Sequence, residues 1–141
     1  MRKRTILFLV MSLQLFIIGC SNNNKDINPN ITREFLKQHA VIGMTDSEIS
    51  IVFGKEAFRE FGDGSFVWIF DRVTNNYTYK PDLQRVAFED IKSGKIKYQL
   101  YINELENKAF MFSYFYKGDN NEVWNYEIRP DGTSDKQATT S

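Results

Sequence analysis

The sequence predicts an α+β domain in which two short helices pack on one face of an antiparallel β-meander of about five strands. Three observations predict it. Apolar residues recur at helical spacing from residue 31 to residue 54, the period changes to two from Gly62 onward, and short turn-forming segments separate the alternating runs. Helices that precede a run of strands are typical of a two-layer sandwich, with the helices on one side of the sheet.

The first 19 residues resemble a secretory signal. Arg2, Lys3 and Arg4 form a basic segment, and an apolar stretch follows at residues 6–18. A helix of that length falls short of a hydrocarbon core of about 30 Å, so a permanent transmembrane span is the weaker interpretation.

The residues Ile17-Ile18-Gly19-Cys20 resemble the lipobox of bacterial lipoproteins. The resemblance implies that signal peptidase II cuts between Gly19 and Cys20, and that Cys20 carries a diacylglyceryl group and further acyl chains. Two or more acyl chains give stable anchoring. We therefore expect an exported protein held by lipid on the outer face of the cytoplasmic membrane, or in the outer membrane of a cell that has one. The alternative is an uncleaved signal anchor in which Cys20 is a free, small apolar residue.

A polar stretch separates the lipobox from the first helix. Residues 20–30 contain little that could pack, so we expect a flexible tether there. The globular domain is predicted to span residues 31–131, and the polar residues 132–141 are expected to form a disordered tail.

The two predicted helices lie at residues 31–38 and 45–53. The second begins at a capping box, because the Thr45 hydroxyl can accept from the Glu48 backbone N–H while the Glu48 carboxylate reaches back to Thr45. Gly54 ends it. The apolar residues with helical spacing are Ile31, Phe35 and Leu36 in the first helix and Ile49, Val52 and Phe53 in the second.

The strands are predicted from five runs of alternating residues, separated by Ser93-Gly94, residues 103–107 and residues 118–121. We expect the aromatic residues of these runs, Trp68 and Trp124 included, to face the helices as core. The five runs are Phe66/Trp68/Phe70, Val86/Phe88, Tyr98/Leu100/Ile102, Phe110/Phe112/Tyr114/Tyr116 and Trp124/Tyr126/Ile128.

Composition excludes several classes of function. The 18 basic and 18 acidic residues balance, and loss of the signal leaves 15 basic against 18 acidic, a net charge of −3, so a nucleic-acid partner is not expected. One cysteine and one histidine exclude a disulfide framework and a Cys/His zinc site. No glycine-rich phosphate loop or nucleophile elbow is present in the sequence, and we predict no cofactor and no metal.

No catalytic set stands out, so we predict that the protein is not an enzyme. His39 ends the first predicted helix, where a structural role near the last carbonyls is ordinary. The pairs Glu104/Glu106 and Asp63/Asp71 could act as acid/base or calcium pairs, but solvated turn residues explain them better.

Residues 31–70 resemble the SmpA/OmlA family, through Ile42-Gly43-Met44-Thr45-Asp46-Ser47-Glu48-Ile49, Phe53-Gly54 and the strand that begins at Gly64-Ser65-Phe66. These are small lipoproteins of the outer-membrane assembly machinery, with a β-lactamase-inhibitor-protein-like fold. The chain departs from the family pattern at Lys55-Glu56, where proline often follows, and in the length of its meander. The resemblance implies protein–protein contacts and no catalysis.

The predicted function is a non-enzymatic interaction domain held at the cell envelope, with an envelope protein as partner. An immunity or conjugative-exclusion lipoprotein and a cell-envelope hydrolase remain alternatives. The sheet face opposite the helices is more apolar than a face that meets water. Either the loop at residues 72–83 covers it or it binds a partner. The residues of this predicted surface are Val67, Ile69, Tyr101, Met111, Phe115 and Val123.

Overall fold

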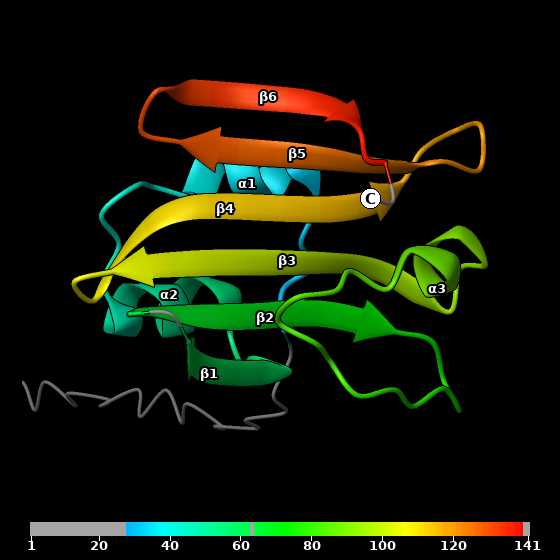
Figure 1. Cartoon of the computed structure of the whole chain (residues 1–141), viewed down its shortest axis with the longest axis horizontal. Helices are drawn as coiled ribbons and strands as arrows, with labels where there is room; N and C mark the ends of the chain where they lie inside the picture. The colour runs from blue at the N-terminus through cyan, green and yellow to red at the C-terminus, as the bar shows by residue number, and fades with distance from the viewer. Residues whose placement is uncertain (1–27, 63, 140–141) are drawn as a thin grey trace, which may run out of the picture.

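The structure, a computed structural model, describes residues 28–62 and 64–139. The predicted signal at residues 1–19, the lipidation site Cys20 and most of the tether lie outside the described residues, as does Asp63. The described part contains three helices and one six-stranded antiparallel sheet, so it is an α+β domain (Figure 1).

The sheet is a simple meander in which each strand pairs antiparallel with the next in the sequence. In its centre Tyr114 lies opposite Leu100 on one neighbouring strand and opposite Tyr126 on the other. The strands are β1 (Phe58–Gly62), β2 (Ser65–Val73), β3 (Ile96–Leu105), β4 (Lys108–Lys117), β5 (Val123–Arg129) and β6 (Gly132–Gln137).

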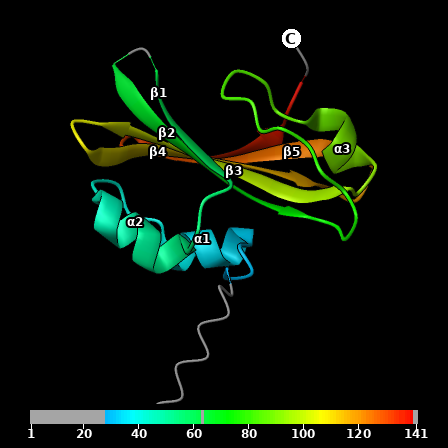
Figure 2. The ribbon, with the colours of Figure 1, turned by 90° about the horizontal axis from the view of Figure 1, so that it is seen from below.

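Two helices precede the sheet, α1 (Arg33–His39) and α2 (Asp46–Phe53). The predicted capping box of α2 is confirmed: the Thr45 backbone N–H donates to the Glu48 carboxylate at 2.8 Å, and the Glu48 N–H donates to the Thr45 hydroxyl at 3.5 Å. Both helices lie on the same side of the sheet (Figure 2).

The main core lies between this helix layer and the sheet. The ring of Phe53, at the end of α2, lies 5.6 Å from the ring of Phe70 and 6.0 Å from that of Phe112, measured between centroids. Phe53 is fully buried, as are Leu36 and Ile49 from the same two helices. The sheet residues in this core are Trp68, Phe70, Tyr98, Leu100, Ile102, Ala109, Phe112, Tyr114 and Tyr126.

The prediction of a strand at Val86/Phe88 is wrong. Phe88–Lys92 forms a short helix, α3, on the side of the sheet opposite α1 and α2 (Figure 2). Phe88 and Ile91 are three residues apart and therefore share a helix face, and Ile91 is fully buried. Two apolar residues in alternation were too few to distinguish a strand from one helical turn.

The sheet has six strands where about five were predicted, because two polar segments at its edges also pair. β1 was not predicted, since Phe58–Gly62 lacks a clean alternation, but it pairs antiparallel with β2. β6 lies within residues 132–141, which were predicted to be a disordered tail. An edge strand is held by backbone hydrogen bonds on one side, so it needs no apolar residues and its composition resembles that of a tail.

The chain is fixed to the domain from its first described residues. The Asn28 side chain donates to the Lys55 carbonyl at 3.0 Å and accepts from the Lys55 N–H at 2.9 Å. Gly54 permits this contact, because its φ is +81° and a Cβ there would lie 2.7 Å from Asn28 Oδ1. The backbone just after α2 therefore fixes the position of Asn28.

None of the helices in the described ranges is both long and apolar enough to cross a membrane.

Candidate functional site

The sheet face opposite α1 and α2, called here the second face, is partly covered by residues 74–92, the covering segment. Gln99, fully buried in β3, holds this segment: its amide N–H donates to the Tyr79 hydroxyl at 2.8 Å and its amide oxygen accepts from the Ala87 N–H at 2.8 Å. The Tyr79 hydroxyl donates in turn to the carboxylate of Asp71 in β2. Three side chains thus join the covering segment to two strands.

Burial perturbs both acidic groups of this network. Burial raises the pKa of Asp71, and the hydrogen bond from Tyr79 opposes that rise. Burial and the neighbouring Asp71 carboxylate both raise the pKa of Tyr79, which lies far above its usual range. The prediction that Asp71 is a solvated turn residue is wrong. Its proposed companion Asp63 lies outside the described residues.

An apolar cluster lies beneath the covering segment. The Tyr101 hydroxyl donates to the carbonyls of Asp82 and Arg85, at 3.0 and 3.3 Å, and its ring meets that of Phe115 edge-on at 5.8 Å. Ile91, Ile96 and Val123 are the buried members of the cluster, against which Tyr77, Tyr79, Val86, Ala87, Phe88, Phe115 and Ala138 pack.

The six residues of the predicted partner surface fall into two groups. Ile69, Tyr101 and Val123 are buried. Val67, Met111 and Phe115 remain partly exposed on the second face. The covering segment contacts Tyr101 through the carbonyls of Asp82 and Arg85, and Val123 through the cluster that contains Ile91, so it covers part of the second face.

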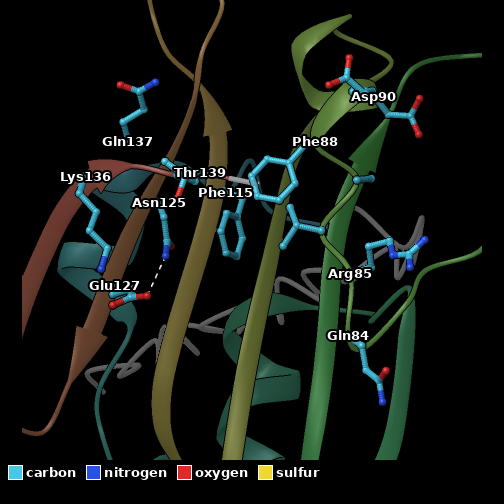
Figure 3. A pocket seen from close by; sticks show the side chains of 14 residues that line it. Gln84, Arg85, Phe88, Asp90, Phe115, Asn125, Glu127, Lys136, Gln137 and Thr139 are labelled. Carbon is cyan, nitrogen blue, oxygen red and sulfur yellow. Dashed lines mark hydrogen bonds between the residues drawn. The ribbon is translucent and has the colours of Figure 1, made fainter. Parts of the chain in front are cut away.

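A groove of about 1040 Å³, the second-face groove, lies between the covering segment and β5–β6 (Figure 3). The rings of Phe88 and Phe115 form its apolar part and meet edge-on with centroids 6.2 Å apart. Its lining residues are Gln84, Arg85, Val86, Ala87, Phe88, Glu89, Asp90, Phe115, Asn125, Glu127, Lys136, Gln137, Ala138 and Thr139.

The polar residues of this groove carry both signs of charge. Asn125 is 6 % exposed and donates to Glu127 at 2.7 Å, while its amide oxygen has no donor among the described residues. Glu127 also lies 3.7 Å from Arg129.

The two unpaired cations of the groove lie on opposite walls. Within the described ranges Arg85, on the covering segment, and Lys136, on β6, form no ion pair. The acidic residues Glu89 and Asp90 pair with Lys92 and Lys95 outside the groove. The groove therefore combines an apolar part, formed by Phe88 and Phe115, with one available positive charge on each side.

The helix-facing side contains a cluster of three charged residues near the start of α2, of which Glu104 is buried. Arg59 of β1 pairs with Asp46 and lies 3.5 Å from Glu104, whose side chain is fully buried. The Arg59 guanidinium stacks over Trp68 at 3.9 Å from the ring centroid. The prediction that Glu104 is a solvated turn residue is wrong, because a bulge at Asn103/Glu104 places it in β3 under α2.

Two acids sharing one guanidinium affect each other's ionisation. Burial raises the pKa of Glu104, and the neighbouring Asp46 carboxylate raises it further, while the nearby Trp68 indole N–H and the attraction of Arg59 oppose the rise. Burial also acts to raise the pKa of Asp46, but the Glu104 carboxyl and Arg59 outweigh it and lower that pKa. This pattern fits one proton held by Glu104 beside an ionised Asp46.

The remaining candidate residues occupy ordinary positions. His39 is the last residue of α1 and is exposed, with its ring 4.5 Å from that of Phe35. Among the described residues no group of three or more His, Cys, Asp and Glu side chains could hold a metal ion. Trp68 is buried in the core as predicted, whereas Trp124 is partly exposed and is not part of the core cluster.

Sequence reasoning missed most of the second-face groove. Phe88 was assigned to a strand and Lys136 to a disordered tail, so neither was placed beside Phe115. The spacing of Phe88 and Ile91, together with Ala138 as an apolar residue near the end of the chain, was the available signal.

Comparison with protein-family models, curated proteins and solved structures gives no match to this chain.

Proposed function

We propose that the protein is a bacterial lipoprotein, anchored through Cys20, whose domain binds another envelope protein without catalysing a reaction. The anchor is supported by the basic residues followed by Ile17-Ile18-Gly19-Cys20. The interaction role is supported by the second-face groove and by the resemblance of residues 31–70 to the SmpA/OmlA lipoproteins.

One observation carries the interaction role: in the second-face groove two aromatic rings lie between two walls that each carry a cation without an ion pair. The rings of Phe88 and Phe115 would receive an apolar side chain of a partner. Arg85 and Lys136 would attract acidic residues that flank it. The partner that fits is a polypeptide segment with an apolar residue between acidic ones.

Cross-linking in cells tests this partner. A photoreactive residue is placed at Gln84 or Gln137 on the rim of the groove, or at Ile51, which is 79 % exposed on α2 and serves as the control. We expect a discrete cross-linked product from the two groove positions alone. Equal products from Ile51, or no product from the groove, would contradict the proposal.

Charge reversal then tests the chemistry of the partner. The double change Arg85→Glu and Lys136→Glu should remove the product, while Lys80→Glu, exposed and outside this groove, should leave it. Met111→Ser tests whether the uncovered apolar residues of the second face contribute, and an unchanged melting curve shows that each variant folds.

The anchor needs a separate experiment. Mass spectrometry of the native N-terminus should find acylated Cys20, and Cys20→Ala should release the protein from the membrane fraction. A variant that is still cleaved after Gly19 and stays membrane-bound to the same degree would disprove lipid anchoring.

A further inference from the structure

A second groove, the aromatic groove, lies on the helix-facing side where the helices do not cover the sheet. Its volume is about 470 Å³. It is bounded by the first residues of α1, the β4–β5 turn and β6, and thus shares none of the residues of the second-face groove. Its central residues are Arg33, Tyr116, Gly118, Asn120, Trp124 and Asp135.

Aromatic rings form one wall of this groove. Trp124 lies opposite Tyr116 across the β4–β5 pair, and Tyr116 stacks on Tyr114 with ring centroids 5.4 Å apart. The indole packs directly against Gly118, since a Cβ at that position would lie 2.6 Å from its Nε1 atom. Glycine is therefore required where the indole lies, and the ring is held at the rim of the groove rather than in the core.

A carboxylate on β6, the strand next to that of Trp124, also lines the groove and is held in place by two neighbours. Arg33 donates to Asp135 Oδ2 at 2.6 Å, and the Tyr116 hydroxyl donates to Asp135 Oδ1 at 3.1 Å. The Asp135 side chain is still 26 % exposed and the Arg33 side chain 40 %. A carboxylate has about four acceptor sites and a guanidinium five donors, so both retain capacity for a ligand.

The charge of the groove narrows the class of ligand. Arg33 is paired with Asp135, and the Lys117 ammonium donates to the Lys92 carbonyl at 2.7 Å. The acidic residues Glu34 and Asp119 also line the groove. Both cations of this groove are thus already engaged by groups of the protein itself, unlike Arg85 and Lys136 of the second-face groove, so the aromatic groove does not favour a phosphate or another anion.

We propose that the aromatic groove binds a neutral glycan, with a sugar ring stacked on Trp124 and its hydroxyls bonded to Asp135 and Arg33. A sugar ring has an apolar face of C–H groups, which suits an indole, and a rim of hydroxyls that donate and accept. A fixed carboxylate accepts from one hydroxyl while the guanidinium donates to its neighbour. This site is independent of the proposed protein partner.

Indole N–H resonances of the full-length chain test the site, with Trp68 and Trp124 each giving one signal. The protein is kept in a zwitterionic detergent, because detergents with sugar headgroups would compete. The probes are N-acetylchitotetraose, maltotetraose, inorganic phosphate and an uncharged Gly-Ser peptide. We expect at least one tetrasaccharide to shift the Trp124 signal with millimolar or tighter affinity, while the Trp68 signal does not move.

Variants of Asp135 and Trp124 test whether these two side chains bind the sugar. Asp135→Asn should weaken the tetrasaccharide roughly tenfold, the equivalent of about 1.4 kcal/mol. Trp124→Phe should also weaken tetrasaccharide binding, because phenylalanine offers a smaller ring. This variant lacks the Trp124 indole signal, so its binding is followed by backbone amide resonances. Asp131→Asn, at a side chain that is 80 % exposed and outside the groove, is the matched control and should change nothing.

Three outcomes would overturn the glycan site. These are no response to either tetrasaccharide, an affinity that Asp135→Asn leaves unchanged, and a Trp124 shift produced by the peptide or by phosphate but not by sugar. A failure of glycan binding would not change the cross-linking result expected at the second-face groove. The two experiments therefore test the two proposals separately.

Discussion

Replacement of Glu104 by glutamine should stabilise the protein at neutral and alkaline pH. The Glu104 side chain is fully buried, and its nearest cation, Arg59, is already paired with Asp46. Neither carboxylate oxygen of Glu104 has a hydrogen-bond donor among the described residues. A second negative charge in this cluster therefore has no cation of its own.

The sign of the pH dependence follows from the raised pKa of Glu104. The folded protein holds the Glu104 proton to higher pH than the unfolded chain, whose glutamate releases it near 4.5. The stability due to this carboxyl is present below 4.5 and is lost as pH rises toward the folded pKa. Asp46, with a lowered pKa, behaves in the opposite way: its contribution is present above 3.8 and is lost in stronger acid.

The expected gain for Glu104→Gln is about 1–3 kcal/mol near pH 8, because the neutral amide avoids the cost of a buried charge that lacks a partner of its own. Near pH 4 the gain should vanish, because the native carboxyl is then protonated and resembles the amide. Urea denaturation at both pH values, followed by tryptophan fluorescence, measures it, and Trp68 lies close enough to Arg59 to report on the cluster.

Glu60→Gln is the matched control, because Glu60 is exposed and adjacent to Arg59 in β1. It should change the free energy of unfolding by less than about 0.5 kcal/mol at either pH. A Glu104→Gln variant that loses stability as pH rises, relative to the unsubstituted protein, would show that an ionised Glu104 stabilises the fold and would refute the reasoning.

Three further predictions concern stability, each measured by chemical or thermal denaturation. Trp68→Ala should cost about 3–5 kcal/mol because the ring is core, whereas Trp124→Ala should cost clearly less, and equal losses would contradict the different burial of the two rings. Thr45→Ala should cost about 1 kcal/mol through loss of the cap. Tyr79→Phe should leave the Gln99 amide N–H without its acceptor, cost about 1–3 kcal/mol and speed hydrogen exchange at Ala87, whose N–H donates to the same amide group. Unchanged exchange at Ala87 would show that the Gln99–Tyr79 bond does not hold the covering segment.

Local patterns in the sequence predicted the helix layer and the central strands well. The capping box at Thr45 and Glu48 is a short-range signal that depends on four residues, and the structure confirms it. The alternation around Leu100 and Phe112 is long enough to fix both the strand and its buried face. These elements were predictable because their own residues determine them.

The candidate sites depend on pairings between residues that are far apart in the sequence. The second-face groove needs Phe88 beside Phe115, and the aromatic groove needs Arg33 beside Asp135, 102 positions away. Both depend on polar segments that fold back on the sheet. A polar composition indicates that side chains are exposed to solvent, but not whether the backbone pairs with a neighbouring strand. The sequence therefore could not predict β6 or the part it forms of each groove.

The bond between Asn28 and Lys55 sets how far the domain can travel. With the anchor at Cys20 as proposed, eight residue steps separate the lipid from the point where the chain is fastened, and a fully extended chain of that length spans at most about 29 Å. Without this bond the tether would also include the residues between Asn28 and the start of α1. With that anchor, a molecule that binds either groove must approach the bilayer to within the extended tether plus the width of the domain, so the tether limits which envelope molecules the domain can meet.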